Sequence, residues 1–228
     1  MRRFLRVIEE RHGIALGDYA ALDEWSSDNI EDYWRDLWAF CDVVGDGPAK
    51  RTVADRDAMF AWADAVAAEH GKVNLIFNNA GVALAATIES MRYEDFAWLM
   101  NINFWDVVHG TQAFLPHLKA TGEGHVVNIS SVFGLASIPT QSAYNAAKFA
   151  VRGFTDALRM ELDAAKCGVS STTIHPGGIK TNIARSARVD ASAGVPGGQD
   201  FGQQFDRMAR TTPTAAARQI LAAVQANR

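Results

Sequence analysis

Three residues in the middle of the chain could carry out proton transfer. Tyr144 and Lys148 stand one helical turn apart, and Ser131 lies upstream of them at the end of an apolar run. Positions i and i+4 share a helix face, so the Lys148 ammonium can lie beside the Tyr144 phenol. A nearby cation is expected to lower the tyrosine pKa from about 10 toward neutral pH, which suits a general acid or base. The alternative is a solvated Tyr/Lys pair on a helix surface.

The elements that would position these residues alternate between helix and strand from Asp55 onward. We predict helices at 57–70, 93–120, 144–165 and 213–225, and strands at 73–77, 125–129 and 169–175. The first two strands are apolar along most of their length, as expected where helices cover both faces of a parallel sheet. The pattern therefore predicts an α/β fold with a doubly wound parallel sheet.

Composition narrows the class of protein. The chain has 228 residues, 48% of them hydrophobic, and a formal net charge of −4. It can bury a core, and it lacks the basic excess of a nucleic-acid-binding protein. Cys41 and Cys167 do not suggest a disulfide framework, and no apolar run approaches the roughly 20 residues of a membrane span. We therefore expect a cytoplasmic protein with no membrane partner, and the histidine spacing predicts no metal site.

Several motifs follow one another in a fixed order. They are Asn78-Asn-Ala-Gly81, Asn103 within Asn101-Ile-Asn-Phe-Trp105, Asn128-Ile-Ser-Ser131, Tyr144 with Lys148, and His175-Pro-Gly-Gly-Ile-Lys-Thr181. Together they resemble the short-chain dehydrogenase/reductase family over about residues 52–228. The resemblance implies a Rossmann-like fold, NAD or NADP as cofactor, and a small alcohol or carbonyl compound as substrate.

The same resemblance implies roles for four residues. Tyr144 would exchange a proton with the substrate oxygen, while Lys148 would stabilise the phenolate and bind the nicotinamide ribose. Ser131 would orient the substrate oxygen, and Asn103 would hold a water that links Lys148 to solvent. A turn cap for Ser131 and a stabilised helix bend for Asn103 are the alternatives. Asn101 is a near alternative to Asn103, and Asp106 stands where the family has glycine.

Two further groups of residues would line the cofactor by resemblance. Asn78, Ala80 and Gly81 would face its adenosine side, with turn formation as the competing account. Beyond the last core strand, the residues expected near the nicotinamide are Pro176, Gly177, Ile179 and Thr181. His175 is expected to pack rather than to act in catalysis.

The beginning of the chain departs from the family. Members open with a glycine-rich turn whose amides approach the cofactor pyrophosphate, and no such turn is present here. The family's Asp-Val dipeptide corresponds to Thr52-Val53. Two lost hydrogen bonds to a charged group would weaken binding by roughly a hundredfold. The fold expected is thus an incomplete Rossmann-like sheet, with the strand at 73–77 exposed as an edge.

Residues 1–45 instead resemble the N-terminal segment of acetoacetyl-CoA synthetases, without the nucleotide-binding core of those enzymes. We predict an all-helical segment at 1–47, a junction near Pro48, and a truncated dehydrogenase domain at 48–228. A helical stripe of large side chains within the first segment is interpreted as packing surface; it comprises Trp34, Leu37, Trp38 and Cys41.

Residues 180–210 are rich in Gly, Ala, Ser and Gln, and they correspond by resemblance to a mobile lobe over the substrate. A simple surface loop is the alternative.

Two hypotheses about function stay open. One is a nicotinamide-dependent oxidoreductase that forms a dimer or tetramer through helices at 93–120 and 144–165. The other is a cofactor-deficient relative that acts as an interaction or scaffold protein, or a non-functional fragment.

Overall fold

The computed structural model describes residues 2–29, 32, 36, 56–191 and 201–227. The chain divides into two compact units, Met1–Thr52 and Val53–Arg228. The boundary predicted after residue 47 lies outside the described residues, as does the predicted stripe at 34–41.

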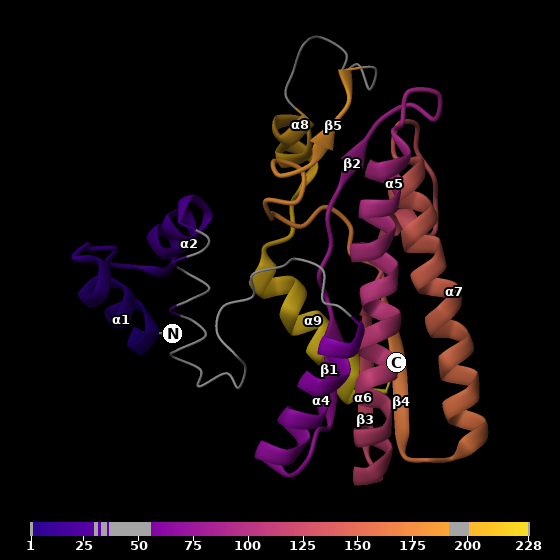
Figure 1. The fold of residues 1–228 in the computed structure, drawn as a ribbon. Helices are drawn as coiled ribbons and strands as arrows, with labels where there is room; N and C mark the ends of the chain where they lie inside the picture. The colour runs from indigo at the N-terminus through magenta and orange to yellow at the C-terminus, as the bar shows by residue number, and fades with distance from the viewer. Residues whose placement is uncertain (1, 30–31, 33–35, 37–55, 192–200, 228) are drawn as a thin grey trace. The chain divides into compact units, whose positions relative to one another are not determined.

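The first unit contains two described helices, α1 (Arg2–His12) and α2 (Tyr19–Asp28) (Figure 1). Asp18 caps α2, because its carboxylate accepts a hydrogen bond from the Ala21 amide at 2.9 Å. Phe4, Ile8 and Leu22 form a small buried cluster between the helices. Asp36 is buried and pairs with Arg11 and His12, so the charge that it brings into the unit is neutralised.

The second unit is built on a parallel sheet with the order β1-β3-β4. Its strands are β1 (Leu75–Asn78), β3 (Gly124–Ile129) and β4 (Val169–Ile174). The α/β class is therefore confirmed. Among the described residues β1 pairs with β3 alone, and Leu75 and Phe77 on it are 38% and 42% exposed. The strand is an edge of the described sheet, as predicted.

The α-helices of this unit include α4 (Arg56–His70), α5 (Tyr93–Met100), α6 (Asp106–Thr121), α7 (Ser142–Ala165) and α9 (Pro213–Gln225). One predicted helix, 93–120, is in fact two α-helices joined by a π-helix at Asn101–Trp105. The π-helix contains Asn103, whose buried side chain hydrogen-bonds the backbone of Val82. A π-turn of this kind is often found at functional sites.

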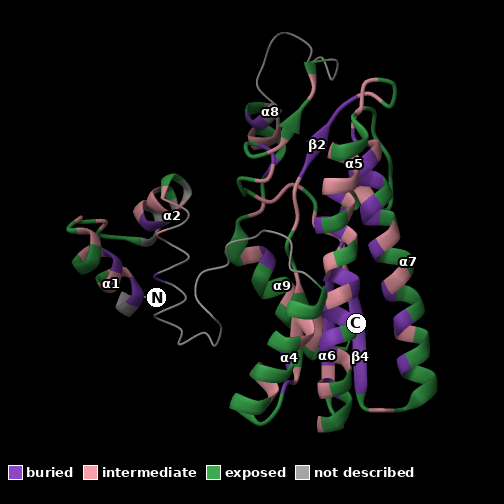
Figure 2. Ribbon diagram, in the orientation of Figure 1, coloured by how far each residue is buried: buried purple, intermediate pink, exposed green. Residues whose placement is uncertain are grey.

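The main core forms where α4, α6 and α7 pack on the sheet. Figure 2 shows buried residues along β4 and on the inward faces of α6 and α7. The largest cluster includes Phe114 and Leu118 from α6, Val126 from β3, and Leu158 and Leu162 from α7. These contacts fix the sheet and α7 relative to each other, which is what a site shared between them requires.

The segment after β4 contains more regular structure than the predicted loop. Strand β5 (Arg188–Val189) pairs in parallel with β2 (Leu84–Ala85), and α8 spans Phe201–Met208. Arg188 anchors the segment to α5 through a 2.7 Å ion pair with Asp95 and by stacking over Trp98. Strands of two residues are too short to show a period in sequence. Across the described helices, none is both long and apolar enough to span a bilayer.

Candidate active site

The predicted site residues gather at the carboxyl end of the parallel sheet. Ser131 follows β3, Gly81 follows β1 and Pro176 follows β4, while Tyr144 and Lys148 come from α7. Open parallel sheets bind ligands at this end, because loops leave several strands there together. The topology therefore brings together residues that are distant in sequence.

Ser131 lies at the point where β3 turns toward α7. Its hydroxyl accepts a hydrogen bond from the Phe133 amide at 3.1 Å and so caps a short 3-10 helix at Val132–Gly134. The same side chain lies near enough to Tyr144 to lower the pKa of its phenol. The two accounts open for Ser131 are thus compatible, since the cap holds a hydroxyl that also reaches the tyrosine.

Lys148 is buried, with only 3% of its surface exposed. Its ammonium donates to the Ile129 carbonyl at 2.9 Å and lies 5.7 Å from the centre of the Tyr144 ring. Burial lowers the pKa of Lys148 to about 8, because the charged form loses hydration. The one-turn spacing does place the cation over the phenol ring.

The predicted lowering of the Tyr144 pKa by Lys148 is wrong. Burial raises the pKa of Tyr144 above its usual value, and the hydrogen bond with Ser131 acts in the opposite direction as the smaller influence. Desolvation of the phenolate therefore decides the direction of the shift. Tyr144 is held neutral, which is the form that can donate a proton.

Asn103 is fully buried beneath the site, whereas Asn101 is exposed. The side-chain oxygen of Asn103 accepts a hydrogen bond from the Val82 amide at 2.8 Å, and its side-chain nitrogen donates one to the Val82 carbonyl at 2.9 Å. This contact fixes the π-helix to the loop after β1, as the helix-bend alternative predicted. A Cβ on Gly81 would lie 3.5 Å from the Asn103 side-chain oxygen and 3.6 Å from the Lys148 ammonium. Gly81 thus lies next to both groups, at a distance where an added methyl group would make ordinary van der Waals contact.

The residues predicted to line the cofactor differ in their surroundings. Asn78 directs its side chain into the fold, donating to Thr111 at 3.1 Å and Asn128 at 2.7 Å. Those bonds favour the structural account of its side chain. Ala80 is exposed in the loop beyond β1. The prediction that Asn78 and Ala80 face the adenosine therefore rests on the backbone of this loop.

The loop after β4 is held on both sides. The Pro176 carbonyl accepts from the Val132 amide at 2.9 Å, which places this loop beside Ser131. Ile179 forms a parallel bridge with Thr211. Gly177 and Thr181 are exposed in the same loop. These positions stay predictions for the nicotinamide side of a cofactor.

Several residues that sequence reasoning did not single out fix the loop between Ser131 and α7. Asn145 donates to the Phe133 carbonyl at 2.8 Å and to the Ala136 carbonyl at 3.0 Å, and Ser130 donates to the Lys148 carbonyl at 2.7 Å. His175, expected to pack, also has a polar contact, 3.0 Å from its Nδ1 to the Ser131 carbonyl. The one signal in the sequence was the proximity of these polar residues to Ser131 and Tyr144.

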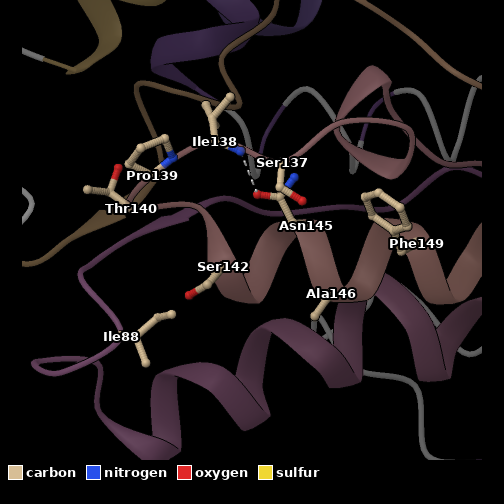
Figure 3. A pocket seen from close by; sticks show the side chains of 9 residues that line it. All are labelled: Ile88, Ser137, Ile138, Pro139, Thr140, Ser142, Asn145, Ala146 and Phe149. Atoms are coloured by element: carbon tan, nitrogen blue, oxygen red, sulfur yellow. Dashed lines mark hydrogen bonds between the residues drawn. The ribbon is translucent and has the colours of Figure 1, made fainter.

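A pocket of about 450 Å³ opens beside the first turns of α7 (Figure 3). Its walls are largely apolar and include Ile88, Ile138 and Phe149, together with Asn145. Neither Tyr144 nor Lys148 lines it. The pocket is thus lined by residues next to that pair in sequence but not by the pair itself.

Around Tyr144 itself the protein is apolar. Tyr144 belongs to a buried cluster with Ala83, Leu84 and Leu99, against which other apolar side chains pack, including Phe133, Ile183 and Ala187. Among the described residues, no group of His, Cys, Asp or Glu side chains could hold a metal ion. The arrangement is thus a Ser–Tyr–Lys group in an apolar setting, suited to moving one proton at a substrate oxygen.

Comparison with known proteins agrees with this geometry. The family model for short chain dehydrogenase matches residues 48–192. SadH of Mycobacterium tuberculosis, named as an oxidoreductase, is 51% identical over 170 residues, or 74% of this chain and 60% of SadH. The chain thus spans 60% of that relative's length.

Solved structures agree as well. A short chain dehydrogenase/reductase from Burkholderia phymatum, in complex with NAD, gives a TM-score of 0.67 at 30% identity, covering 76% of this chain and 66% of that one. A short-chain dehydrogenase from Streptomyces avermitilis gives 0.70 at 25% identity, covering 85% and 71%. The chain belongs to the short-chain dehydrogenase family.

Proposed function

We propose that this protein is an NAD- or NADP-dependent oxidoreductase that interconverts small alcohols and carbonyl compounds. The observation that carries the proposal is the meeting of Ser131, Tyr144 and Lys148 at the carboxyl end of the sheet. These are the groups that a proton transfer to a carbonyl oxygen needs: a donor, a group that orients the acceptor, and a cation that favours the phenolate formed.

In the direction of reduction, the Tyr144 hydroxyl gives its proton to the substrate carbonyl oxygen. Ser131 donates a hydrogen bond to the same oxygen and fixes its position. Lys148 stabilises the resulting phenolate, and the charge favours the ammonium form of Lys148 in turn. A bound nicotinamide would supply the hydride in this direction and accept it in the reverse.

The residues present fit such a cofactor on its ribose side. Within the described part of the chain, the Lys148 ammonium donates one hydrogen bond, to Ile129, although it carries three N–H donors. Gly81 lies beside the ammonium, since a Cβ there would be 3.6 Å from it. Lys148 and Tyr144 would therefore hold the ribose hydroxyls, and the loop at Pro176, Gly177, Ile179 and Thr181 the nicotinamide. The NAD complex of the Burkholderia relative supports this class of cofactor.

The second candidate is a cofactor-deficient relative that acts as an interaction or scaffold protein, or a non-functional fragment. Two observations favour it: the sequence has no glycine-rich turn, and β1 carries the exposed apolar residues Leu75 and Phe77. Edge strands of this kind are sites for pairing with other chains. This hypothesis predicts no saturable binding of either nucleotide.

Titration with NADH and with NADPH, followed by nucleotide fluorescence, separates the two hypotheses. We expect saturable binding of at least one nucleotide, weakened by Lys148→Met because the ribose loses a charged donor. The expected loss is about tenfold or more. Absence of saturable binding for both nucleotides refutes the oxidoreductase proposal.

We further propose that two or four copies assemble through the α5–α7 face, because Trp105, Phe149 and Met160 there are 47%, 40% and 73% exposed. Sedimentation of the intact chain tests this.

The cytoplasmic location and the synthetase-like segment at 1–45 stay predictions from sequence, and no adenylating activity is proposed.

A further inference from the structure

His175 lies where the two loops that carry the candidate site meet. It follows β4 directly, its side chain is half-buried, and Pro176 comes next in the loop proposed to hold the nicotinamide. Its Nδ1 lies 3.0 Å from the carbonyl oxygen of Ser131, and a carbonyl can only accept, so the imidazole donates this hydrogen bond. His175 therefore joins the loop after β4 to the residue whose hydroxyl is proposed to orient the substrate.

The bond from His175 runs against the direction of the backbone bonds on either side of it. The Ser130 amide donates to the last carbonyl of β4 at 2.8 Å, and the Val132 amide donates to the Pro176 carbonyl at 2.9 Å. Pro176 has no backbone N–H with which to donate in return. The His175 imidazole instead donates from the loop after β4 to Ser131 itself.

The other bonds to Ser131 come from its own turn. Its carbonyl also accepts the Gly134 amide at 2.8 Å, and its hydroxyl accepts the Phe133 amide at 3.1 Å. A carbonyl oxygen has two lone pairs, so Gly134 and His175 together satisfy it. The bonds within the turn keep its shape, whereas the bond from His175 fixes Ser131 relative to the loop after β4.

We propose that His175 is a positioning residue that holds Ser131 in register with the loop after β4. The inference rests on the oxidoreductase function proposed above. Ser131 would hold the substrate oxygen while that loop holds the nicotinamide, so the reaction needs a constant separation between the two. A misplacement of about 1 Å can lower a rate by about 100-fold. His175 acts through Ser131 and needs no contact with the substrate.

The test replaces His175 with side chains that differ in where they carry an N–H. Asparagine has its amide nitrogen at the place of Nδ1, so His175→Asn can keep the bond to Ser131. Leucine has the branched shape of asparagine without the donor, and glutamine carries its nitrogen one bond further out, near the place of Nε2. His70→Leu, at an exposed position at the end of α4, is the matched control.

The substrates are three ketones, 2-octanone, cyclohexanone and acetophenone, each with NADH and with NADPH. We expect kcat for the best of them to fall by about 10- to 100-fold in His175→Leu and in His175→Gln. In His175→Asn it should stay within about threefold of the wild type, because the donor is kept. The Tm of His175→Leu should fall by only about 1–6 °C, since the backbone bonds of Ser130 and Val132 remain.

A double-mutant cycle with Ser131→Ala separates positioning from general damage to the fold. If His175 acts through the Ser131 hydroxyl, His175→Leu should lower kcat by less than about threefold in a chain that already carries Ser131→Ala. General damage would instead add its full effect to that of Ser131→Ala. If His175→Leu fails to fold, the comparison of His175→Asn with His175→Gln decides the question.

The tautomer of His175 gives a readout that needs no substrate. The bond to Ser131 requires the proton of the neutral ring on Nδ1, since the bond made by a ring nitrogen sets the tautomer. We expect ¹⁵N NMR of the histidine-labelled chain to show the Nδ1–H form in alkaline buffer, where imidazoles are neutral. The signal that His175→Asn removes identifies the residue.

The possible failures are distinguishable. The positioning role is overturned by an Nε2–H tautomer, by wild-type turnover in His175→Gln, or by a loss in His175→Asn as large as that in His175→Gln. An undiminished effect of His175→Leu in the Ser131→Ala chain overturns it as well. Each of these results leaves the oxidoreductase proposal standing. A wild-type chain that reduces none of the three ketones with either nucleotide overturns the oxidoreductase proposal and this inference with it.

Discussion

At the scale of single residues, burial governs the acid–base behaviour of the site. Burial lowers the pKa of Lys148 and raises that of Tyr144, so both shifts favour the neutral side chain. The apolar cluster around Tyr144 is the cause, since it removes water from both groups. At pH 7 the protein therefore holds a neutral Tyr144 beside a charged Lys148, and the burial of that charge lowers the free energy of unfolding.

The buried lysine makes stability depend on pH. Burial lowers the pKa of Lys148 from 10.5 to about 8, so between these pH values the unfolded chain binds more protons than the folded one. The free energy of unfolding is therefore highest above pH 10.5 and decreases as the pH falls through 8. Lys148→Met should therefore be more stable than the wild type at pH 7 by about 2 kcal/mol, after allowance for the lost bond to Ile129. Urea unfolding of both proteins at pH 7 and pH 10 measures the difference.

The advantage of the methionine variant should shrink at the higher pH, where the folded wild type has shed most of the charge. Lys119→Met, at an exposed position near the end of α6, is the matched control. Equal differences at the two pH values would contradict the buried, charged state of Lys148.

At the scale of elements, α7 and the loop that follows β3 form one unit. Ser130 and Asn145 join the loop to the helix through three hydrogen bonds to backbone carbonyls of Phe133, Ala136 and Lys148. These bonds set the distance between Ser131 and Tyr144. The catalytic geometry thus depends on residues that do not touch a substrate.

Gly134 allows the close approach of this loop to α7. A Cβ at this position would lie 2.3 Å from the Ser130 hydroxyl and 2.7 Å from the Lys148 carbonyl. Gly134→Ala should therefore push the loop off the helix, with a loss of about 1–3 kcal/mol in unfolding free energy and a lower kcat. Urea unfolding and steady-state kinetics measure both effects.

Gly153→Ala, on the helix α7 against which this loop packs, is the control. Its added Cβ meets no atom within 4 Å, so alanine there should stabilise the protein by about 0.5–1 kcal/mol. If Gly134→Ala proved as stable and active as Gly153→Ala, the account of the close approach would be wrong.

The sequence predicted elements with strong local signals and missed those set by distant contacts. The core strands β1, β3 and β4 were found because each is a short run of apolar or β-branched residues near turn residues. The π-helix was missed because it depends on Asn103 bonding to Val82, 21 positions away. Strands β2 and β5 were missed because two residues show no period. Ser131, Tyr144 and Lys148 were predicted together from motif order.

What the sequence could not show is burial. The pKa of Tyr144 was predicted from its neighbour's charge, whereas desolvation decides its direction. Gln141 and Asn145 look like ordinary polar residues at the start of a helix. Only their surroundings in the structure reveal that the side-chain nitrogen of Gln141 has no hydrogen-bond partner and that Asn145 holds the loop after β3.

At the scale of the whole molecule, the dehydrogenase unit presents β1 as an edge of its described sheet. Phe77 is 42% exposed, and the strand pairs on one side among the described residues. Lysine on an edge strand opposes pairing between chains. Phe77→Lys should therefore reduce light scattering at high protein concentration without changing the far-UV circular dichroism.

Leu221→Lys, which replaces an exposed apolar residue on α9, controls for added charge alone. If both variants lowered scattering equally, net charge rather than the strand edge would be responsible. If Phe77→Lys left the light scattering unchanged, this edge would not drive self-association.

The most direct test of the proposed activity is nucleotide oxidation by the intact chain with a ketone substrate. The wild type should oxidise NADH or NADPH only when the ketone is present. Tyr144→Phe should lower kcat by about 100- to 10,000-fold because it removes the proton donor, while nucleotide binding should weaken by no more than about tenfold through the lost bond to the ribose. Tyr93→Phe, at a position 85% exposed, should leave kcat unchanged. Turnover by Tyr144→Phe equal to that of the wild type would contradict the role of Tyr144 as the proton donor.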